Sequence, residues 1–373
     1  MIAATDRIYL QPTAMVARPH GLDGRFHRIR DGIVWFTAYL VIWRDEKGGV
    51  RKGEQTVPVD ELPAFLERLS QPVRDQAALQ LAALQSPTQP LALGARTIRL
   101  NSPQVMGIIN ATPDSFSDGG AYEHAEEAAI NAGFAMGEAG AAIVDVGGES
   151  TRPGAPLVWE GDEINRVQPV VTALAKGGVA VSLDTRKSAV MESGLAAGAG
   201  LINDISALLY DDRALGIVKT SGAPVILMHA PSYKSDPHEG ANYSDTLLDV
   251  YDWLVARVEA VAAAGIDRSK IIIDPGLGFG KGVNDNLALI NGAALFHTIG
   301  CPLLIGASRK RLIGALDNEA PADQRLGGSI ALHLAAIERG VQIIRAHDVP
   351  ETVQAIRVWQ GMRDAALTAP FVE

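Results

Sequence analysis

Hydrophobic residues follow a regular alternating pattern from about residue 104 onward. Short apolar runs recur, and stretches with apolar residues at helical spacing separate most of them. Strands that alternate with helices predict βαβ units and a parallel sheet. The eight runs are Val105–Ile109, Ala142–Val146, Val179–Leu183, Gly200–Ile205, Pro224–Met228, Ile271–Ile273, Pro302–Ile305 and Val341–Ile344. The helical stretches include Glu123–Glu138, Ser188–Ala197, Thr246–Ala264 and Asn286–Thr298.

The number and length of these units favour one architecture within the α/β class. Eight strand–helix units match a (β/α)8 TIM barrel, which typically needs about 250 residues. The strands are almost continuously apolar, as expected for a parallel sheet buried on both faces. We therefore predict a barrel over residues 101–373, with a doubly wound sheet as the structural alternative.

The first hundred residues lack this alternation and predict a small α/β domain. The β-branched and aromatic run 33–43 precedes a turn-like segment, 44–50, which favours a hairpin. Residues 60–84 carry apolar positions at helical spacing and predict one or two helices, and 85–89 have linker composition. No motif with evident chemistry occurs here, and the arginines at 25, 28 and 30 are expected on a solvated face.

Polar residues stand at the carboxyl end of every predicted barrel strand. In a TIM barrel these ends converge on the mouth that holds the active site. The strand-end residues are Asn110; Asp145 with Glu149, Ser150, Thr151 and Arg152; Asp184 and Thr185; Asn203 and Asp204; His229; Asp274; Ser308, Arg309 and Lys310; and Arg345, His347 and Asp348. Helix capping explains one such residue but not all eight sets. The pattern therefore predicts a binding site at this mouth.

The residue types at these strand ends indicate two kinds of ligand group. Asp184, Asn203 and Asp274 suit a flat heterocycle with several N–H donors, and Lys310 offers a donor for its carbonyl. A second set suits an anion, preferably a phosphate, because arginine pairs with oxyanions in a bidentate manner. That set comprises Arg345, His347, Asn110 and Arg152. In addition, Gly276, Gly278 and Gly280 allow a tight loop near a ligand.

Composition and charge narrow the class of protein. A formal net charge of −10 disfavours a general nucleic-acid binder. The single cysteine, Cys301, excludes an intrachain disulfide framework and favours a reducing, cytoplasmic setting. No apolar run approaches the ~20 residues of a membrane span, and the N-terminal segment lacks the core of a signal peptide. Residues 1–100 carry 13 Lys and Arg against 10 Asp and Glu, so the acidic charge lies in the predicted barrel.

Several segments together resemble the dihydropteroate synthases. Two long ones, VMGIINATPDSFSDGG at 105–120 and AAIVDVGGESTRPGA at 141–155, are similar to the signatures of that family. Six shorter matches follow in the family's order: SLDTRK at 182–187, INDIS at 202–206, Met228–His229, DPGLGFGK at 274–281, GASRK at 306–310 and RAHDV at 345–349. The resemblance covers about residues 104–365.

The resemblance implies a TIM-barrel transferase of folate biosynthesis. Such enzymes join 4-aminobenzoate to 6-hydroxymethyl-7,8-dihydropterin diphosphate, giving 7,8-dihydropteroate and diphosphate. The family uses Mg²⁺, is usually dimeric and is a sulfonamide target. Implied partners are therefore two small molecules and a second copy of the chain.

The resemblance also implies roles for individual residues. Those assigned to the pterin are Asp184, Asn203, Met228, Asp274, Phe279, Gly306, Lys310 and Arg345. The diphosphate would meet Asn110, Thr151, Arg152, Arg345 and His347, with Asn110 next to the metal. Phe116, Thr151, Arg152, Pro153 and Ser308 would form the 4-aminobenzoate site and its loops. The expected catalytic set is Asp184, Lys310, Arg345 and His347, and Glu149 is expected to pair with Arg152.

One departure and two alternatives qualify this assignment. After Met228–His229 the family commonly has a loop with glycine, whereas residues 230–238 here read APSYKSDPH. A barrel that transfers a methyl group from a pterin to a corrinoid would share the pterin residues. However, the GASRK and RAHD segments favour a diphosphate substrate. A non-catalytic pterin-binding subunit is the other alternative, although Asp184, Lys310 and Arg345 are all present.

Overall fold

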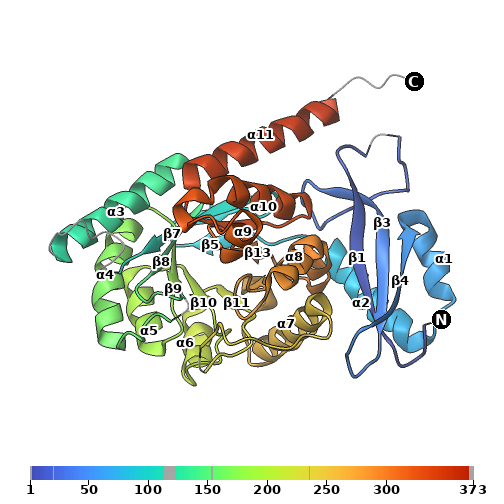
Figure 1. Cartoon of the computed structure of the whole chain (residues 1–373), viewed down its shortest axis with the longest axis horizontal. Coiled ribbons are helices and arrows are strands. Elements are labelled where there is room, and N and C mark those ends of the chain that lie inside the picture. Colours follow the sequence, from blue (N-terminus) through green and yellow to red (C-terminus); the bar gives the residue numbers. More distant parts are fainter. Residues whose placement is uncertain (1, 20, 113–121, 153, 235, 369–373) are drawn as a thin grey trace.

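The computed structural model describes residues 2–19, 21–112, 122–152, 154–234 and 236–368. The larger part is a parallel barrel surrounded by helices, with an antiparallel sheet beside it (Figure 1). This arrangement confirms the predicted TIM barrel preceded by a small strand-and-helix region. None of the helices within these ranges is long and apolar enough to cross a membrane.

The barrel strands are arranged in sequence order. They are β7 (Gln104–Asn110), β8 (Ile143–Gly147), β9 (Val181–Asp184), β10 (Leu201–Asp204), β11 (Val225–Met228), β12 (Ile271–Asp274), β13 (Leu304–Ile305) and β14 (Ile343–Ala346). Each pairs in parallel with the next from β7 to β12, and β14 joins β7 to β13. A parallel bridge between Ile273 and Leu303 links β12 to the segment before β13. Each of the eight predicted runs therefore overlaps one barrel strand.

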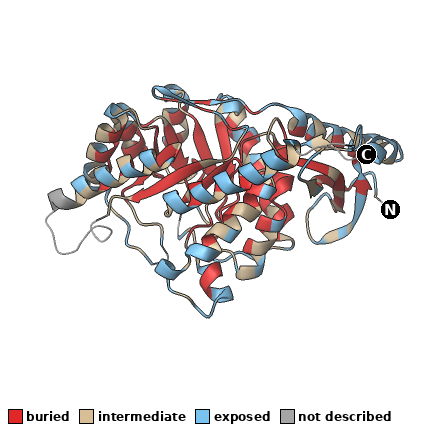
Figure 2. Ribbon diagram, turned by 90° about the horizontal axis from the view of Figure 1, so that it is seen from above, coloured by how far each residue is buried: buried red, intermediate tan, exposed pale blue. Residues whose placement is uncertain are grey.

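Helices cover the outside of the barrel with their apolar faces inward (Figure 2). They are α3 (Tyr122–Ala139), α4 (Glu160–Lys176), α5 (Ser188–Ala197), α6 (Ala214–Ser221), α7 (Thr246–Ala263), α8 (Val283–Asn291), α9 (Arg311–Leu316), α10 (Leu326–Glu338) and α11 (Val349–Thr368). Short 3-10 turns are η3 (Arg268–Lys270), η4 (Ala293–Ile299) and η5 (Ala322–Gln324). The helical stretch expected over 286–298 is divided in two, because α8 ends at Asn291 and the 3-10 helix η4 begins after Gly292. A Cβ there would lie 2.3 Å from Leu247 Cδ2.

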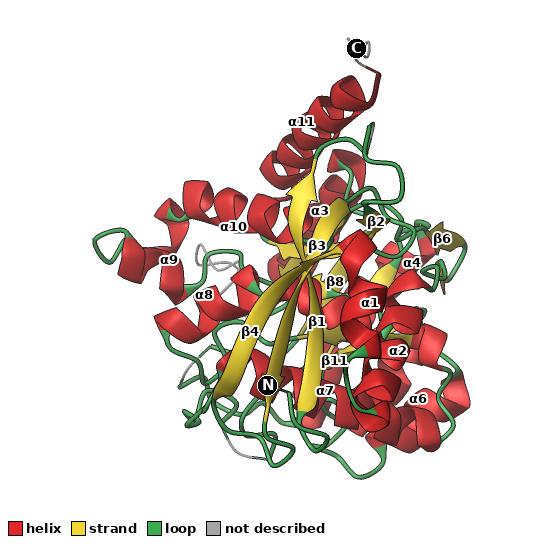
Figure 3. Ribbon diagram, turned by 90° about the vertical axis from the view of Figure 1, so that its right-hand side faces the viewer, coloured by secondary structure: helices red, strands yellow, loops and turns green. Residues whose placement is uncertain are grey.

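The N-terminal region is an antiparallel sheet with two short helices (Figure 3). Its elements are β1 (Arg7–Val16), β2 (His27–Arg28), β3 (Trp35–Arg44), β4 (Arg51–Pro58), η1 (Val59–Glu61), α1 (Leu62–Glu67) and α2 (Gln71–Gln85). The hairpin and helices match the prediction, whereas β1 was not predicted. On α2, Gln80 donates to Ile8 O at 2.7 Å and accepts from Leu10 N at 2.8 Å. These bonds satisfy backbone groups at the edge of β1.

A second hairpin closes the amino end of the barrel. Strands β5 (Leu91–Leu93) and β6 (Arg96–Ile98) pair with each other, and their apolar residues pack against the first residues of the barrel strands. Sequence periodicity did not reveal this plug, because each strand has only three residues. The hairpin lies before residue 100, where we placed the boundary between the two domains, although it packs against the barrel. The domain boundary itself stays a prediction.

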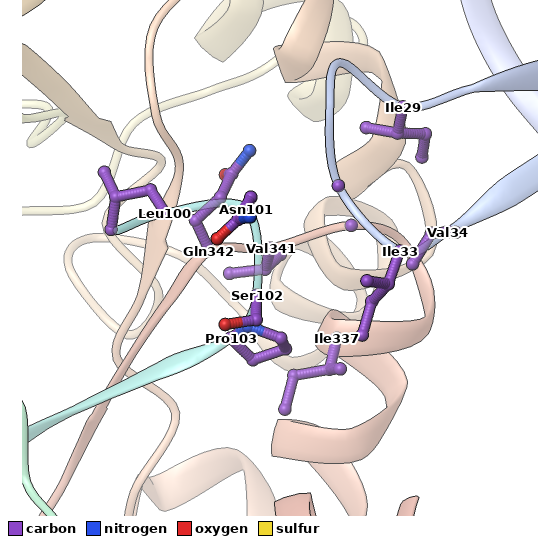
Figure 4. A pocket seen from close by; sticks show the side chains of 12 residues that line it. Ile29, Ile33, Val34, Leu100, Asn101, Ser102, Pro103, Ile337, Val341 and Gln342 are labelled. Atoms are coloured by element: carbon purple, nitrogen blue, oxygen red, sulfur yellow. The ribbon is translucent and has the colours of Figure 1, made fainter. Parts of the chain in front are cut away.

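The sheet and the barrel also meet next to this plug. A small hollow of about 20 Å³ lies between the two parts. In Figure 4, Ile29, Ile33 and Val34 lie on one side of it, and the residues of 100–103 and 337–342 lie on the other. That volume is about enough for one water molecule. Nearby, Arg30 is buried and donates to Thr88 Oγ1 at 2.7 Å. The expectation that Arg30 lies on a solvated face is therefore wrong, although Arg25 and Arg28 are exposed.

Candidate active site

An arginine bound to two carboxylates occupies the carboxyl mouth of the barrel. Arg345 on β14 donates from Nε to Asp145 Oδ2 at 2.7 Å and from Nη2 to Asp184 Oδ2 at 2.7 Å. Asn203 Nδ2 reaches the same Asp145 oxygen at 2.9 Å. We call Arg345, Asp145, Asp184 and Asn203 the mouth cluster. It joins four strands, because β8, β9, β10 and β14 each contribute one residue.

Strand register explains why these residues meet. Asn203 pairs in register with Asp184 across β9 and β10. Alternate residues on a strand point to opposite faces, so neighbouring Asn203 and Asp204 act differently. Asp204 is buried and accepts bonds from Ser206 and Leu208, which makes it a turn-stabilising residue. Of this pair, only Asn203 joins the mouth cluster.

Asp145 is the member of the cluster that was not assigned to the site. It was noted only as a polar residue near a strand end, yet it is fully buried and bonds both Asn203 and Arg345. Its other oxygen, Oδ1, is buried and has no hydrogen-bond partner among the residues that the structure describes. A carboxylate inside the apolar strand 143–147 is the sequence signal that could have identified it, because buried charge requires a partner.

Electrostatic conditions in the mouth shift several pKa values. Burial, reinforced by the charge of Asp145, raises the pKa of Asp184 to about 7, while Arg345 opposes the rise. Burial likewise raises the pKa of Asp274, whose Oδ1 accepts from Gly276 N at 2.7 Å. Burial and nearby Arg345 lower the pKa of Lys310 to about 8. Strongly shifted groups in a cleft are typical of functional sites.

An apolar wall lies beside these charged groups. Met228 and Phe279 belong to one buried cluster with Ile205 and Ala230. The Lys310 ammonium lies 4.4 Å from the centroid of the Phe279 ring, which is a cation–π contact. Gly306 follows β13, and a Cβ there would lie 3.8 Å from Arg345 Cβ. The predicted pterin residues therefore occupy one end of the barrel.

The loop after β12 requires glycine. Gly276 has φ of +70°, and a Cβ there would lie 1.9 Å from His229 O. Lys281 Nζ donates to Gly276 O at 2.9 Å and to Phe279 O at 3.1 Å, which holds the loop closed. Lys281 was not predicted to have a role. The tight loop expected from the glycine spacing is confirmed.

His347 and Ser308 form a pair at the last two strand ends. Ser308 Oγ lies 3.0 Å from His347 Nδ1 and accepts from His347 N at 3.1 Å. Burial, with Arg345 and Arg309 nearby, lowers the pKa of His347 to about 3, so the ring is neutral near pH 7. Asp348 pairs with Arg309, whose Nε lies 3.0 Å from Oδ2.

The remaining predicted residues lie on or near loops. Asn110 ends β7 and is half-buried, Thr151 is half-buried, and the Arg152 side chain is exposed. Phe116 and Pro153 lie outside the described residues. The expected pairing of Glu149 with Arg152 is wrong. Glu149 instead accepts from Arg186 at 2.9 Å and from Lys187. These two cations lie in the short segment between β9 and α5, beside the loop that carries Glu149.

Comparison with known proteins agrees with this geometry. Residues 106–347 match the family model described as pterin binding enzyme. Dihydropteroate synthase from Escherichia coli strain K12 is 44% identical over 270 residues, covering 72% of this chain and 95% of that protein. The corresponding protein from Bacillus subtilis is 40% identical over 276 residues, covering 74% and 92%.

Solved structures show the same likeness. Xanthomonas albilineans dihydropteroate synthase with 4-aminobenzoic acid superposes with a TM-score of 0.71 at 43% identity, covering 76% of this chain and all of that one. The same enzyme in complex with 7,8-dihydropteroate gives a TM-score of 0.68 at 41% identity, covering 75% of this chain and all of that one. The chain therefore belongs to the pterin-binding enzymes and, within them, to the dihydropteroate synthase family.

Proposed function

We propose that the chain condenses 6-hydroxymethyl-7,8-dihydropterin diphosphate with 4-aminobenzoate, forming 7,8-dihydropteroate and diphosphate. The observation that carries the proposal is the mouth cluster, where Arg345 binds two carboxylates beside Lys310 and the Phe279 wall. Membership of the family and the named ligands of the Xanthomonas structures support the same reaction.

The pterin ring would bind among the polar strand ends. Asp184 and Asp274 would accept ring N–H groups, Asn203 would use its amide, and Lys310 would donate to the ring carbonyl. Arg345 would stack on the ring and reach the phosphate. Met228 and Phe279 would line the apolar side, and Gly306 leaves space beside Arg345.

The reaction breaks the bond between the pterin CH₂ carbon and the diphosphate oxygen. Its electron pair leaves with diphosphate, and the amine nitrogen of 4-aminobenzoate supplies the pair for the new C–N bond. The nitrogen then loses a proton to solvent. Asp184 would stabilise positive charge on the pterin, and Arg345 with neutral His347 would stabilise the departing diphosphate. The arylamine is already nucleophilic, so no covalent enzyme nucleophile is assigned.

The residues present fit Mg²⁺ held mainly by substrate. Across the described ranges, no three His, Cys, Asp or Glu side chains gather into a metal-binding group. Mg²⁺ commonly binds one or two protein oxygens together with substrate phosphates and waters. The Asn110 amide oxygen, at the end of β7, would supply the protein ligand. When bound, the ion would neutralise charge on the diphosphate.

The 4-aminobenzoate would lie outside the pterin, toward the loops. Thr151 and Arg152 follow β8, and Ser308 follows β13, so these residues border the same mouth. Phe116 and Pro153 complete the proposed set. Thr151 and Arg152 would also approach the diphosphate.

A diphosphate-release assay with both substrates tests this function. We expect release that needs Mg²⁺ and both substrates, and that falls at least tenfold in Asp184→Asn and in Lys310→Ala. Absence of release from the folded wild-type protein would reject the reaction and favour a non-catalytic pterin-binding subunit. A requirement for a corrinoid would favour the methyltransferase alternative.

Two further properties belong to the proposal. We expect a homodimer, which light scattering after gel filtration would test. We also expect a cytoplasmic location, in keeping with the single buried thiol of Cys301. Fractionation of cells that express the chain would test the location.

A further inference from the structure

His238 connects two loops at the rim of the mouth. Its Nε2 lies 2.5 Å from Thr151 O, in the loop after β8, and its Nδ1 lies 3.1 Å from Gly278 O, in the loop after β12. We call these two contacts the His238 bridge. Because both partners are carbonyl oxygens, a ring with one N–H donates to one of them and a ring with two N–H groups donates to both. The residue itself lies in the loop after β11, in the segment that departs from the family pattern. Three separate loops therefore meet at one imidazole.

The His238 ring also packs on the wall of the site. It stacks on the Phe279 ring with centroids 4.9 Å apart and planes 14° apart. Phe279 is the ring that the Lys310 ammonium contacts. A displacement of His238 would therefore change the packing of the apolar wall as well as the position of the Thr151 loop.

The loop after β8 has a second anchor at its far end. Lys187 Nζ donates to Val158 O at 2.6 Å and to Glu163 Oε2 at 2.5 Å, and it also bonds Glu149. The side chains of Lys187, Glu149 and Glu163 are largely buried. Because Lys187 bonds Glu149 at the start of the loop and Val158 at its end, it fixes both ends. Thr151 lies between them, and its carbonyl oxygen contacts His238 Nε2. Removal of His238 would thus free the middle of this loop without releasing its ends.

We propose that His238 is a positioning residue for the second substrate, acting by holding Thr151 and Arg152 over the pterin pocket. This inference rests on the proposed function. Of the residues assigned to the pterin, Phe279 stacks on the His238 ring, whereas the carboxylates of Asp184 and Asp274 stand at the ends of β9 and β12. Loss of the bridge is therefore expected to weaken capture of 4-aminobenzoate while leaving pterin binding almost unchanged.

Two substitutions separate the hydrogen bonds from the ring stacking. His238→Phe keeps a ring against Phe279 but has no N–H donor, whereas His238→Gln keeps an amide donor without the ring. We expect His238→Phe to raise the KM for 4-aminobenzoate about tenfold, the effect of losing about one hydrogen bond. The KM for the pterin diphosphate and kcat at saturation should stay within about twofold. His238→Gln should recover most of the loss.

Exposed Lys234 lies in the same loop, so Lys234→Ala is the matched control and should behave like wild type. An unchanged KM for 4-aminobenzoate in His238→Phe, or equal increases in both KM values, would overturn the proposal. If the wild-type chain released no diphosphate, the proposed reaction would be rejected independently of the role of His238.

Hydrogen exchange of the backbone amides over residues 148–152 would then test whether the His238 bridge holds this loop. Faster exchange in His238→Phe than in Lys234→Ala supports the bridge, and equal exchange overturns it.

Discussion

In the described part of the chain, two clusters each pair one arginine with two aspartates, and they differ in what surrounds them. In the mouth cluster, Arg345 binds Asp145 and Asp184. At the junction between the N-terminal sheet and the barrel, Arg44 on β3 binds Asp249 and Asp252 on α7. We call Arg44, Asp249, Asp252 and Tyr9 the junction cluster. Both clusters join segments that are far apart in the sequence.

The junction cluster is paired more completely. Arg44 is 2% exposed, and its Nε donates to Tyr9 Oη at 2.8 Å. Asp252 also accepts from Tyr9 at 3.0 Å and from Arg7, while Asp249 accepts from Ser244 N at 2.9 Å. In the mouth cluster, by contrast, Asp145 Oδ1 is buried and has no hydrogen-bond partner within the described part of the chain, and burial raises the pKa of Asp184. Fully satisfied polar networks make a structure rigid, whereas groups with strongly shifted pKa values in a cleft are typical of functional sites.

The largest expected effect comes from removing the arginine of the mouth cluster. Arg345→Met should lower kcat/KM for the pterin diphosphate about 100- to 1000-fold, because it removes a donor to the leaving group and leaves two carboxylates without their cation. Diphosphate release under limiting substrate measures this change. A rate within tenfold of wild type, in a folded variant, would contradict the assigned role.

The equivalent change at the junction should affect stability instead. Arg44→Met leaves Asp249 and Asp252 without their cation, and we expect the free energy of unfolding to fall by about 3 kcal/mol. Both aspartates are partly exposed, so the loss should be smaller than for a fully buried pair. Urea unfolding measures the loss. Activity per folded molecule should stay within about twofold, and a large drop in kcat would show that the two clusters are not separable.

The pH dependence of activity should report the mouth cluster. Asp184 must be ionised to accept pterin N–H groups, and its raised pKa of about 7 means that it gains a proton as the pH falls. Lys310 must be protonated to donate, and its lowered pKa of about 8 means that it loses its proton as the pH rises. We therefore expect a narrow bell-shaped profile of kcat/KM, with a fall of about tenfold per pH unit on each side.

Substitutions assign the two limbs of this profile. Asp184→Asn should remove the acidic limb, and Lys310→Arg should move the basic limb upward, because arginine stays protonated. Arg44→Met is the control and should retain the wild-type profile. If Asp184→Asn retained the acidic limb and Lys310→Arg left the basic limb at the same pH, groups other than Asp184 and Lys310 would determine the profile.

The smallest expected effect concerns a partly exposed ion pair beside the junction. Arg51 Nε lies 2.5 Å from Asp245 Oδ2, and Arg51 is 32% exposed. A double-mutant cycle of Arg51→Ala and Asp245→Ala should give a coupling energy of about 0.5–1 kcal/mol. Asp245→Ala alone should cost about 1 kcal/mol more, because Asp245 also caps α7 by accepting from Leu248 N. A coupling above 2 kcal/mol would show that this pair belongs to the junction cluster.

Local patterns were sufficient for most of the fold. The eight apolar runs predicted the barrel strands because strands buried on both faces need consecutive apolar residues. Pattern was not sufficient for three-residue strands such as β5 and β6, or for β1, in which Gln11, Pro12 and Thr13 interrupt the apolar residues. Helical spacing over 286–298 did not reveal the break at Gly292 that separates α8 from the 3-10 helix η4.

The sequence by itself determined the barrel, the polar mouth and the family, since these depend on periodicity and on local motifs. Only the tertiary structure decided which polar residues act together. Asp145 binds a partner 200 residues away, and Glu149 binds two cations in the segment between β9 and α5 instead of the neighbouring Arg152. His238 meets Thr151 across 87 residues. A side chain's partners depend on distance and direction in space, and a linear pattern contains neither.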